Sequence, residues 1–166
     1  QDFFIKAVPG VKARMGRGMH FIVAGSGDWL PKMRSLSWSL GLASDVTFVS
    51  PFDRFEDVLG VMDVVVYTSL EDVSAYSLLE AMACGRPVVA FSTPAVCSIL
   101  EHGRTGLIVS KRDVGALVEA VVSVLSDEVL ARELADAARR RVEDTYDASL
   151  MARETLRVYD EVGATA

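Results

Sequence analysis

The stretch Asp72–Pro87, which reads Asp-Val-Ser-Ala-Tyr-Ser-Leu-Leu-Glu-Ala-Met-Ala-Cys-Gly-Arg-Pro, decides the fold. It follows a short apolar run, Val64–Tyr67, and leads into another, Val88–Phe91. Such runs, without polar alternation, are typical of strands buried on both faces of a parallel sheet. Between them, Ala75–Ala83 has the composition of a helix, which the following Gly-Arg-Pro would end. The stretch therefore predicts a strand, a helix and a second strand.

The same alternation extends through most of the chain. Three further strands are predicted, at His20–Ala24, Val46–Val49 and Gly106–Val109. Further helices are predicted at Phe3–Met15, Trp29–Leu40, Arg54–Met62 and Ala95–Glu101, with a helical tail from Asp113 that breaks near Asp127 and Asp147. Strands alternating with helices predict an α/β fold, a Rossmann-like parallel sheet with helices on both faces. Without a linker or repeat, residues 1–166 are predicted to form one domain.

Several predicted helix ends carry residues that favour a boundary. Asp28 is expected to cap the helix Trp29–Leu40, and Asp53 with Glu56 three residues later forms an Asp version of a capping box. Gly85 lies just after the predicted helix Ala75–Ala83, at the position where a glycine commonly ends a helix.

Composition excludes several function classes. The chain is 51% hydrophobic and 24% charged, which indicates a globular domain, and no apolar run is long enough to span a bilayer. Its net charge of −6 disfavours a nucleic-acid or anionic membrane surface. The basic run Arg139–Arg141 lies among acidic residues in a helical stretch, so we interpret it as a solvated helix face with intrahelical ion pairs.

The two cysteines, Cys84 and Cys97, have apolar neighbours and cannot form a disulfide framework. We expect buried packing residues rather than catalytic thiols, in a reducing, cytoplasmic location. The only histidines, His20 and His102, fall at a predicted strand start and a predicted helix end. Two isolated histidines form no ligand cluster, so no metal is expected.

Candidate binding residues follow the predicted strands, because ligands of open parallel sheets bind beyond the carboxyl ends of the strands. The first loop contains Gly25, Ser26 and Gly27, a fragment of a phosphate-binding pattern that a plain tight turn explains equally well. In the second, Ser50, Pro51 and Phe52 can hold a nucleobase, or Phe52 can staple the start of the next helix.

The third loop, Thr68–Ser74, leads into a helix that begins near Ala75, whose unpaired N–H groups would point at a bound anion. Glu80 lies within this helix among apolar neighbours, so we expect its carboxylate to be buried and to have partners. The hydroxyls of a ribose are suitable partners. The alternative is a structural carboxylate that bonds the backbone or a neighbouring helix.

The spacing of these residues resembles the donor-site motif of retaining glycosyltransferase family 4, which has the GT-B fold. That motif has an acid, seven residues, then Glu-Ala-Met-Ala, a variable residue, Gly, a variable residue and Pro-Val-Val. Here Asp72 is followed after seven residues by Glu80 and the rest of the motif through Val89. Val23–Gly27, Val46–Phe48 and Gly103–Val109 are similar to further elements of the family.

The resemblance implies that the chain is the C-terminal, nucleotide-sugar-binding half of the enzyme, and that the acceptor-binding N-terminal domain is absent. The full enzyme would transfer a hexosyl group from a UDP- or GDP-sugar to an unknown acceptor hydroxyl, with retention and by a front-face route. It implies no metal or other cofactor, and the chain lacks the Asp-X-Asp motif of the other major glycosyltransferase fold. Any membrane contact would involve the missing half.

The resemblance also implies residue roles. Glu80 would bind the ribose hydroxyls, and Asp72 the hydroxyls of the donor sugar. The amides of Val73, Ser74, Ala75 and Tyr76 would face the sugar and the diphosphate. Residues 50–52 would hold the base edge, and residues 25–27 would approach the donor.

The chain departs from the family in two respects. The usual Glu-Gly-Phe-Gly-Leu is replaced by the sequence Asp72–Tyr76, which leaves the donor sugar open, and Glu71 is an alternative acid with eight intervening residues. The Arg and Lys that neutralise the departing diphosphate lie upstream of Gln1 in the family. We therefore expect this chain alone to bind a nucleotide weakly and to transfer little or nothing.

Two other functions fit the same alternation of strands and helices. A receiver-like signalling domain would need an acidic pair after the first strand and a phosphorylatable Asp after the third, where the chain offers Asp28 and Asp72. A sugar-nucleotide epimerase or phosphorylase of the same fold is the second alternative, since fold does not fix chemistry.

Overall fold

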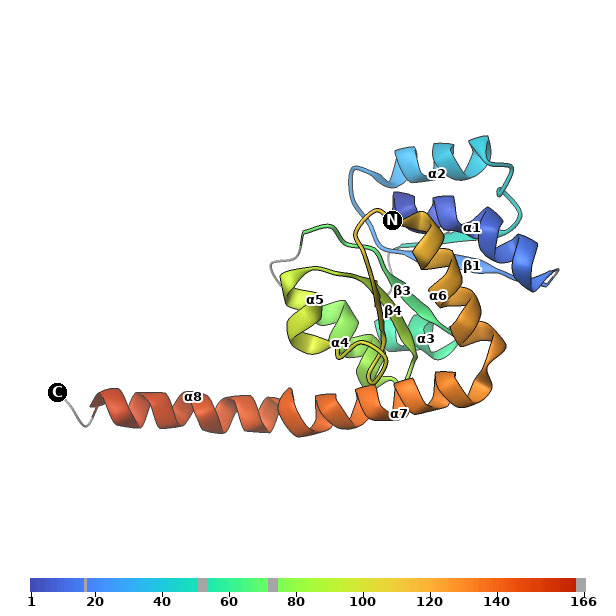
Figure 1. The fold of residues 1–166 in the computed structure, drawn as a ribbon. Helices are drawn as coiled ribbons and strands as arrows, with labels where there is room; N and C mark the ends of the chain where they lie inside the picture. Colours follow the sequence, from blue (N-terminus) through green and yellow to red (C-terminus); the bar gives the residue numbers. More distant parts are fainter. Residues whose placement is uncertain (17, 51–53, 72–74, 164–166) are drawn as a thin grey trace.

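The computed structural model describes residues 1–16, 18–50, 54–71 and 75–163 (Figure 1). Its strands are β1 (Phe21–Ala24), β2 (Val46–Val49), β3 (Val65–Tyr67), β4 (Val88–Phe91) and β5 (Leu107–Val109). Its helices are α1 (Asp2–Met15), α2 (Leu30–Ser39), α3 (Phe55–Gly60), α4 (Tyr76–Ala83), α5 (Pro94–Ile99), α6 (Val114–Ser126), α7 (Glu128–Thr145) and α8 (Ala148–Gly163). The predicted alternation of strands and helices is confirmed.

The strands pair in parallel, as predicted, but the described strands form two hydrogen-bonded groups rather than one sheet. In the first group β1 pairs with β2, with Phe21 opposite Val46. In the second, the order is β3-β4-β5, with Val65 opposite Val88. No pairing joins β1 to β3 in the part of the chain that the structure describes.

Strand β4 shows how the helices cover both faces of the strands. Val89 and Phe91 pack into a core with α1 and α6, whereas Val88 and Ala90 pack into a second core with α4 and α5. All four side chains are fully buried. Successive residues of a strand point to opposite faces, so a continuous apolar run is the sequence of a strand covered on both sides. The prediction of helices on both faces is therefore confirmed.

The helix boundaries confirm the predicted break at Asp127 and contradict one capping prediction. Asp127 accepts hydrogen bonds from the amides of Val129 and Leu130, each at 3.0 Å, at the predicted break in the tail. The cap assigned to Asp28 is wrong, because Leu30 donates to the Gly27 carbonyl in a turn and α2 begins after Trp29 without a side-chain cap. Asp53 lies outside the described residues.

The basic run on α7 is only in part the solvated face that its sequence indicates. Arg139 pairs with Glu143 one turn later at 2.9 Å, as expected. Arg141 instead leaves its own helix, donating to the Ile99 carbonyl at 2.6 Å and pairing with Glu101 at 2.5 Å. The interpretation of Arg141 as an intrahelical partner was therefore wrong, and the side chain holds α7 against the end of α5.

The cysteine prediction was wrong for Cys97, which is exposed, while Cys84 is half-buried. Helix α5 has only six residues and turns Val96 and Ile99 toward the core, so Cys97 between them faces outward. Its sulfur lies 3.6 Å from the Ser92 hydroxyl.

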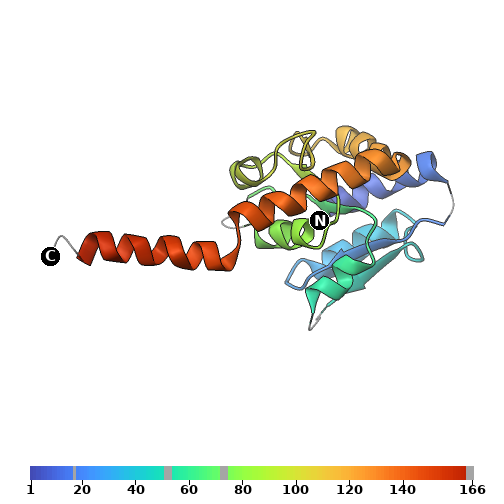
Figure 2. The ribbon, with the colours of Figure 1, turned by 90° about the horizontal axis from the view of Figure 1, so that it is seen from below.

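Helix α8 projects away from the rest of the chain (Figures 1 and 2). None of its residues is buried. In the described part of the chain, no helix combines the length and the apolar character needed to cross a membrane.

Gly106 is a position where packing excludes a side chain. A Cβ there would lie 3.0 Å from the Val88 carbonyl oxygen and 3.1 Å from a methyl carbon of Leu100. We expect Gly106→Ala to lower the free energy of unfolding by about 1–3 kcal/mol, as overpacking typically does. Gly60→Ala is the control, because a Cβ at Gly60 meets nothing within 4 Å. Urea denaturation of both variants measures this, and equal stabilities would contradict it.

Candidate functional site

The first candidate loop lies beyond the carboxyl end of β1. Gly25 donates a hydrogen bond to the Val49 carbonyl at 3.0 Å, which places residues 25–27 beside the end of β2. Gly25 and Gly27 have φ values of 143° and 134°, a region that L-residues with a Cβ rarely adopt. A Cβ on Gly25 would lie 3.3 Å from the side-chain nitrogen of Gln1. The loop, which includes Ser26, therefore lies against the N-terminus of α1.

The second loop begins at Ser50, which is exposed and directly follows β2. Pro51 and Phe52 lie outside the described residues, so base binding and the helix staple both stay predictions. Where the chain is described again, Arg54 hydrogen-bonds Glu56 at 2.9 Å. This hydrogen bond holds the pKa of the Glu56 carboxyl below its ordinary value.

The third loop starts with Thr68, which is buried, and Ser69, whose hydroxyl donates to the Glu71 carbonyl at 3.0 Å. Asp72, Val73 and Ser74 lie outside the described residues, and their roles stay predictions. Helix α4 then begins without a side-chain cap at Ala75. The amides of Tyr76 and Ser77 lie in its first turn, where no intrahelical carbonyl is available to them.

Glu80 lies one helical turn after Tyr76, and the prediction that it is buried was wrong. Tyr76, Glu80 and Ala83 form an exposed stripe along α4, while the opposite side packs into the core. These three side chains are exposed because no described helix or strand packs against this side of α4. The Glu80 carboxylate has no hydrogen bond or ion pair with any described residue. The alternative to ribose binding, a carboxylate that bonds the backbone or a neighbouring helix, is therefore not present among these residues. Both carboxylate oxygens are available to a ligand.

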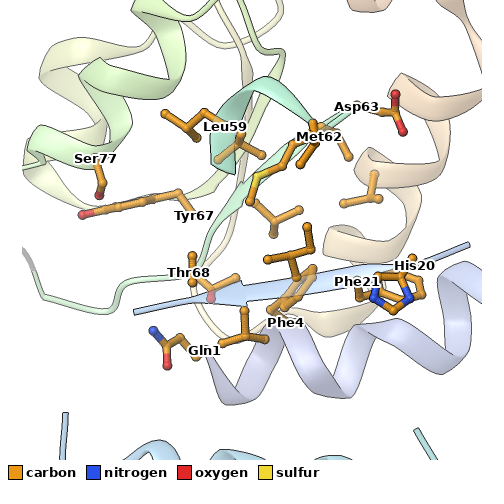
Figure 3. A pocket seen from close by; sticks show the side chains of 18 of the residues that line it. Gln1, Phe4, His20, Phe21, Leu59, Met62, Asp63, Tyr67, Thr68 and Ser77 are labelled. Carbon is orange, nitrogen blue, oxygen red and sulfur yellow. The ribbon is translucent and has the colours of Figure 1, made fainter. Parts of the chain in front are cut away.

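A cavity of about 450 Å³ lies between β1 and β3 and reaches the start of the third loop. At the carboxyl ends of the strands it is lined by Gln1, Thr68, Ser69 and Ser77, and Figure 3 shows the Tyr67 hydroxyl pointing toward Ser77. Gln1 and Ser77 were not among the predicted site residues. The sequence could have indicated Ser77, because it lies in the first turn of a helix that follows a strand. It could not have indicated Gln1, because Gln1 lines the cavity only as a result of how α1 packs in the fold.

The histidines have structural partners. His20 Nε2 lies 2.7 Å from the Thr47 hydroxyl, and His102 Nδ1 accepts the amide hydrogen of Ile108 at 2.9 Å. In the ranges that the structure describes, no three His, Cys, Asp or Glu residues gather as a metal site.

A family model described as glycosyl transferases group 1 matches residues 1–127. The chain belongs to the group 1 glycosyltransferases. This glycosyltransferase chain is 29% identical over 160 residues to an uncharacterized glycosyltransferase of Methanocaldococcus jannaschii, covering 95% of this chain and 40% of the relative. It is also 29% identical to a GDP-mannose-dependent α-(1-6)-phosphatidylinositol monomannoside mannosyltransferase of Mycobacterium tuberculosis, covering 86% and 39%.

The fold of this glycosyltransferase chain matches that of Anabaena HepE in a crystal structure with UDP. The TM-score is 0.89, with 20% sequence identity, and the match covers 97% of this chain and 45% of HepE. The predicted GT-B type of α/β fold is thereby confirmed. The chain spans about 40% of the length of the two curated relatives.

Proposed function

We propose that this group 1 glycosyltransferase domain binds the donor, a UDP- or GDP-hexose, in a retaining hexosyltransferase. One observation carries the proposal: the last residue of β1, Ala24, and the first residues after β3, Thr68 and Ser69, line one cavity together with Ser77 of α4, and the exposed, unpaired carboxylate of Glu80 follows Ser77 by about one helical turn. This is the end of a parallel sheet where nucleotides bind in α/β proteins.

Glu80 accepts hydrogen bonds from the two ribose hydroxyls. Its exposed carboxylate supports this role, since it can accept two hydrogen bonds without losing any within the described residues. The first-turn amides of α4, including those of Ala75 and Tyr76, donate to the diphosphate, where the positive end of the helix dipole adds to the attraction. Asp72 binds hydroxyls of the sugar, with Glu71 as the alternative acid.

Two relatives support the choice of donors. HepE was crystallised with UDP, and the mycobacterial relative is named for its dependence on GDP-mannose. In this chain, the loop that starts at Ser50 holds the base edge, and the loop Gly25–Gly27 approaches the donor.

The reaction is the transfer of the hexosyl group to an acceptor hydroxyl. The acceptor oxygen forms its bond to the anomeric carbon on the face from which the diphosphate departs. The bond from that carbon to the diphosphate oxygen breaks, and the hydroxyl proton passes to the departing phosphate, so the configuration is retained. The acceptor and the cations that stabilise the diphosphate belong to the rest of the enzyme, together with any membrane contact. The step needs no metal or cofactor.

The proposed location is the cytoplasm. Cys84 and Cys97 are free thiols, which fit a reducing compartment.

The function is tested on the full-length protein and on residues 1–166. With a UDP- or GDP-hexose and candidate acceptors, we expect the full-length protein to release UDP or GDP and to form a glycoside whose anomeric configuration, measured by NMR, equals that of the donor. Residues 1–166 should bind the nucleotide at millimolar concentration by calorimetry and form no glycoside.

Other products would contradict this function. An epimerised nucleotide sugar or a sugar phosphate would assign an epimerase or a phosphorylase. A stable acyl phosphate on Asp72 after treatment with a small phosphodonor would assign a receiver domain.

A further inference from the structure

Tyr76 carries an exposed aromatic ring at the start of α4. It is the first residue of the helix, and 72% of its surface is exposed. No described residue bonds to its hydroxyl or packs a ring or a cation against it. In contrast, the Tyr67 hydroxyl points toward Ser77 (Figure 3), and the Tyr146 hydroxyl donates to the Ser98 carbonyl. A single exposed ring needs no explanation by itself, so its place in the fold decides what it can do.

The Tyr76 ring lies on the same stripe of α4 as Glu80, one turn earlier. Residues four apart on a helix are neighbours on its surface. Helical side chains lean toward the N-terminus of their helix, so the Glu80 carboxylate reaches back toward Tyr76, and the Tyr76 ring reaches toward the start of α4. The two side chains therefore follow one another along a line that leads to the amides of the first turn.

The donor has one part that the proposed function does not yet place on α4. The ribose lies at Glu80, and the diphosphate lies at the amides of the first turn. The base lies at the loop that starts at Ser50, after β2, and β2 pairs with β1 rather than with β3. The base is thus held away from the start of α4. The hexosyl group, which is bonded to the outer phosphate, is the part that lies beside the Tyr76 ring.

The chemistry of the ring also favours the hexosyl group over the diphosphate. The face of an aromatic ring is the negative part of its quadrupole, so it does not attract a phosphate. A hexose carries C–H groups on the faces of its ring, and packing them against an aromatic ring removes apolar surface from water. Around the start of α4, the side chains of Ser69, Glu71 and Ser77 are available to the hydroxyls at the rim of the sugar. Aromatic rings beside a few polar groups are typical of small-molecule sites.

We propose that the Tyr76 ring packs against the C–H face of the hexosyl group and thereby contributes to the choice of donor sugar. The contact rests on the proposed function, because it requires the diphosphate at the first turn of α4. A sugar with a hydroxyl on that face would bind less well, because the hydroxyl would lie against an apolar surface without a hydrogen bond.

The test compares a nucleotide with its nucleotide sugar. The probes are UDP and GDP, together with the UDP- or GDP-hexose that the full-length protein consumes, and calorimetry measures their affinities. We expect Tyr76→Ala to lower the affinity of the full-length protein for the nucleotide sugar by on the order of 10-fold, the loss of one aromatic contact. The affinity for UDP or GDP should stay as it was, since neither has a hexosyl group.

Two further variants separate the ring from general effects of substitution. Tyr76→Phe keeps the ring, so it should bind the nucleotide sugar as the unchanged protein does. Trp38→Ala removes a ring that is 78% exposed on α2, outside the candidate site, and should change neither affinity. Because both rings are exposed, the melting temperatures of all three variants should match that of the unchanged protein.

Several outcomes would overturn the contact while leaving the proposed function intact. Equal losses for nucleotide and nucleotide sugar in Tyr76→Ala would show that the ring contacts the nucleoside or the diphosphate instead. Unchanged affinities, or a Tyr76→Phe variant as weak as Tyr76→Ala, would also contradict it. In these cases, loss of nucleotide binding in Glu80→Gln still supports the donor site. A full-length protein that consumes no UDP- or GDP-hexose would refute the proposed function, and this contact with it.

Discussion

Glu80→Gln is expected to weaken binding of UDP or GDP to the full-length protein by about 10- to 100-fold, the loss of hydrogen bonds to a charged group. The free energy of unfolding should not change. The carboxylate is exposed and has no partner within the described residues, so its removal leaves the packing of α4 as it was. Calorimetric titration with each nucleotide measures the first effect, and thermal denaturation measures the second.

A matched control separates this effect from a general change of charge. Glu133 is exposed on α7 and lies outside the candidate site. Glu133→Gln should leave nucleotide binding as it is. If Glu80→Gln binds UDP and GDP as tightly as the unchanged protein, the assignment of the ribose to Glu80 is wrong.

Phe91→Ala is expected to have the largest effect on stability, a loss of about 3–5 kcal/mol in the free energy of unfolding. Phe91 is completely buried in β4 and meets the ring of Phe3 edge-on, with centroids 5.6 Å apart. Since domains are stable by about 5–15 kcal/mol, this substitution removes a large fraction of the total. Urea denaturation followed by near-UV circular dichroism measures it.

Trp38→Ala is the control for the loss of an aromatic ring. Trp38 is 78% exposed on α2, so its removal should change the free energy of unfolding by no more than about 0.5 kcal/mol. Similar losses for the two variants would show that Phe91 does not occupy a closely packed core.

Much of the fold could be predicted because the signals are local. The apolar run at Val88–Phe91 indicates a strand covered on both faces, and the structure buries each of its residues. Gly85 ends α4 with φ of 65°, the left-handed conformation expected of a glycine after a helix. These features depend on residues next to each other in the sequence.

The remaining features depend on partners distant in sequence. Arg141 finds Glu101 forty residues away, which no helical spacing indicates. Glu80 is exposed because no described element packs on its side of α4, and a count of apolar neighbours cannot show that. An apolar strand next to a gap has the same sequence pattern as one inside a continuous sheet, so the separation of β1 from β3 was not predictable either.

Helix α8 has a consequence for how unfolding of residues 1–166 is measured. It is 16 residues long and none of its residues is buried, so its helicity depends on its own backbone and on pairs such as Arg157 with Glu161. Isolated helices of this length are marginal in water. Far-UV circular dichroism should therefore begin to fall at a lower temperature than the near-UV signal of the aromatic core, and a single two-state transition will not describe the whole chain.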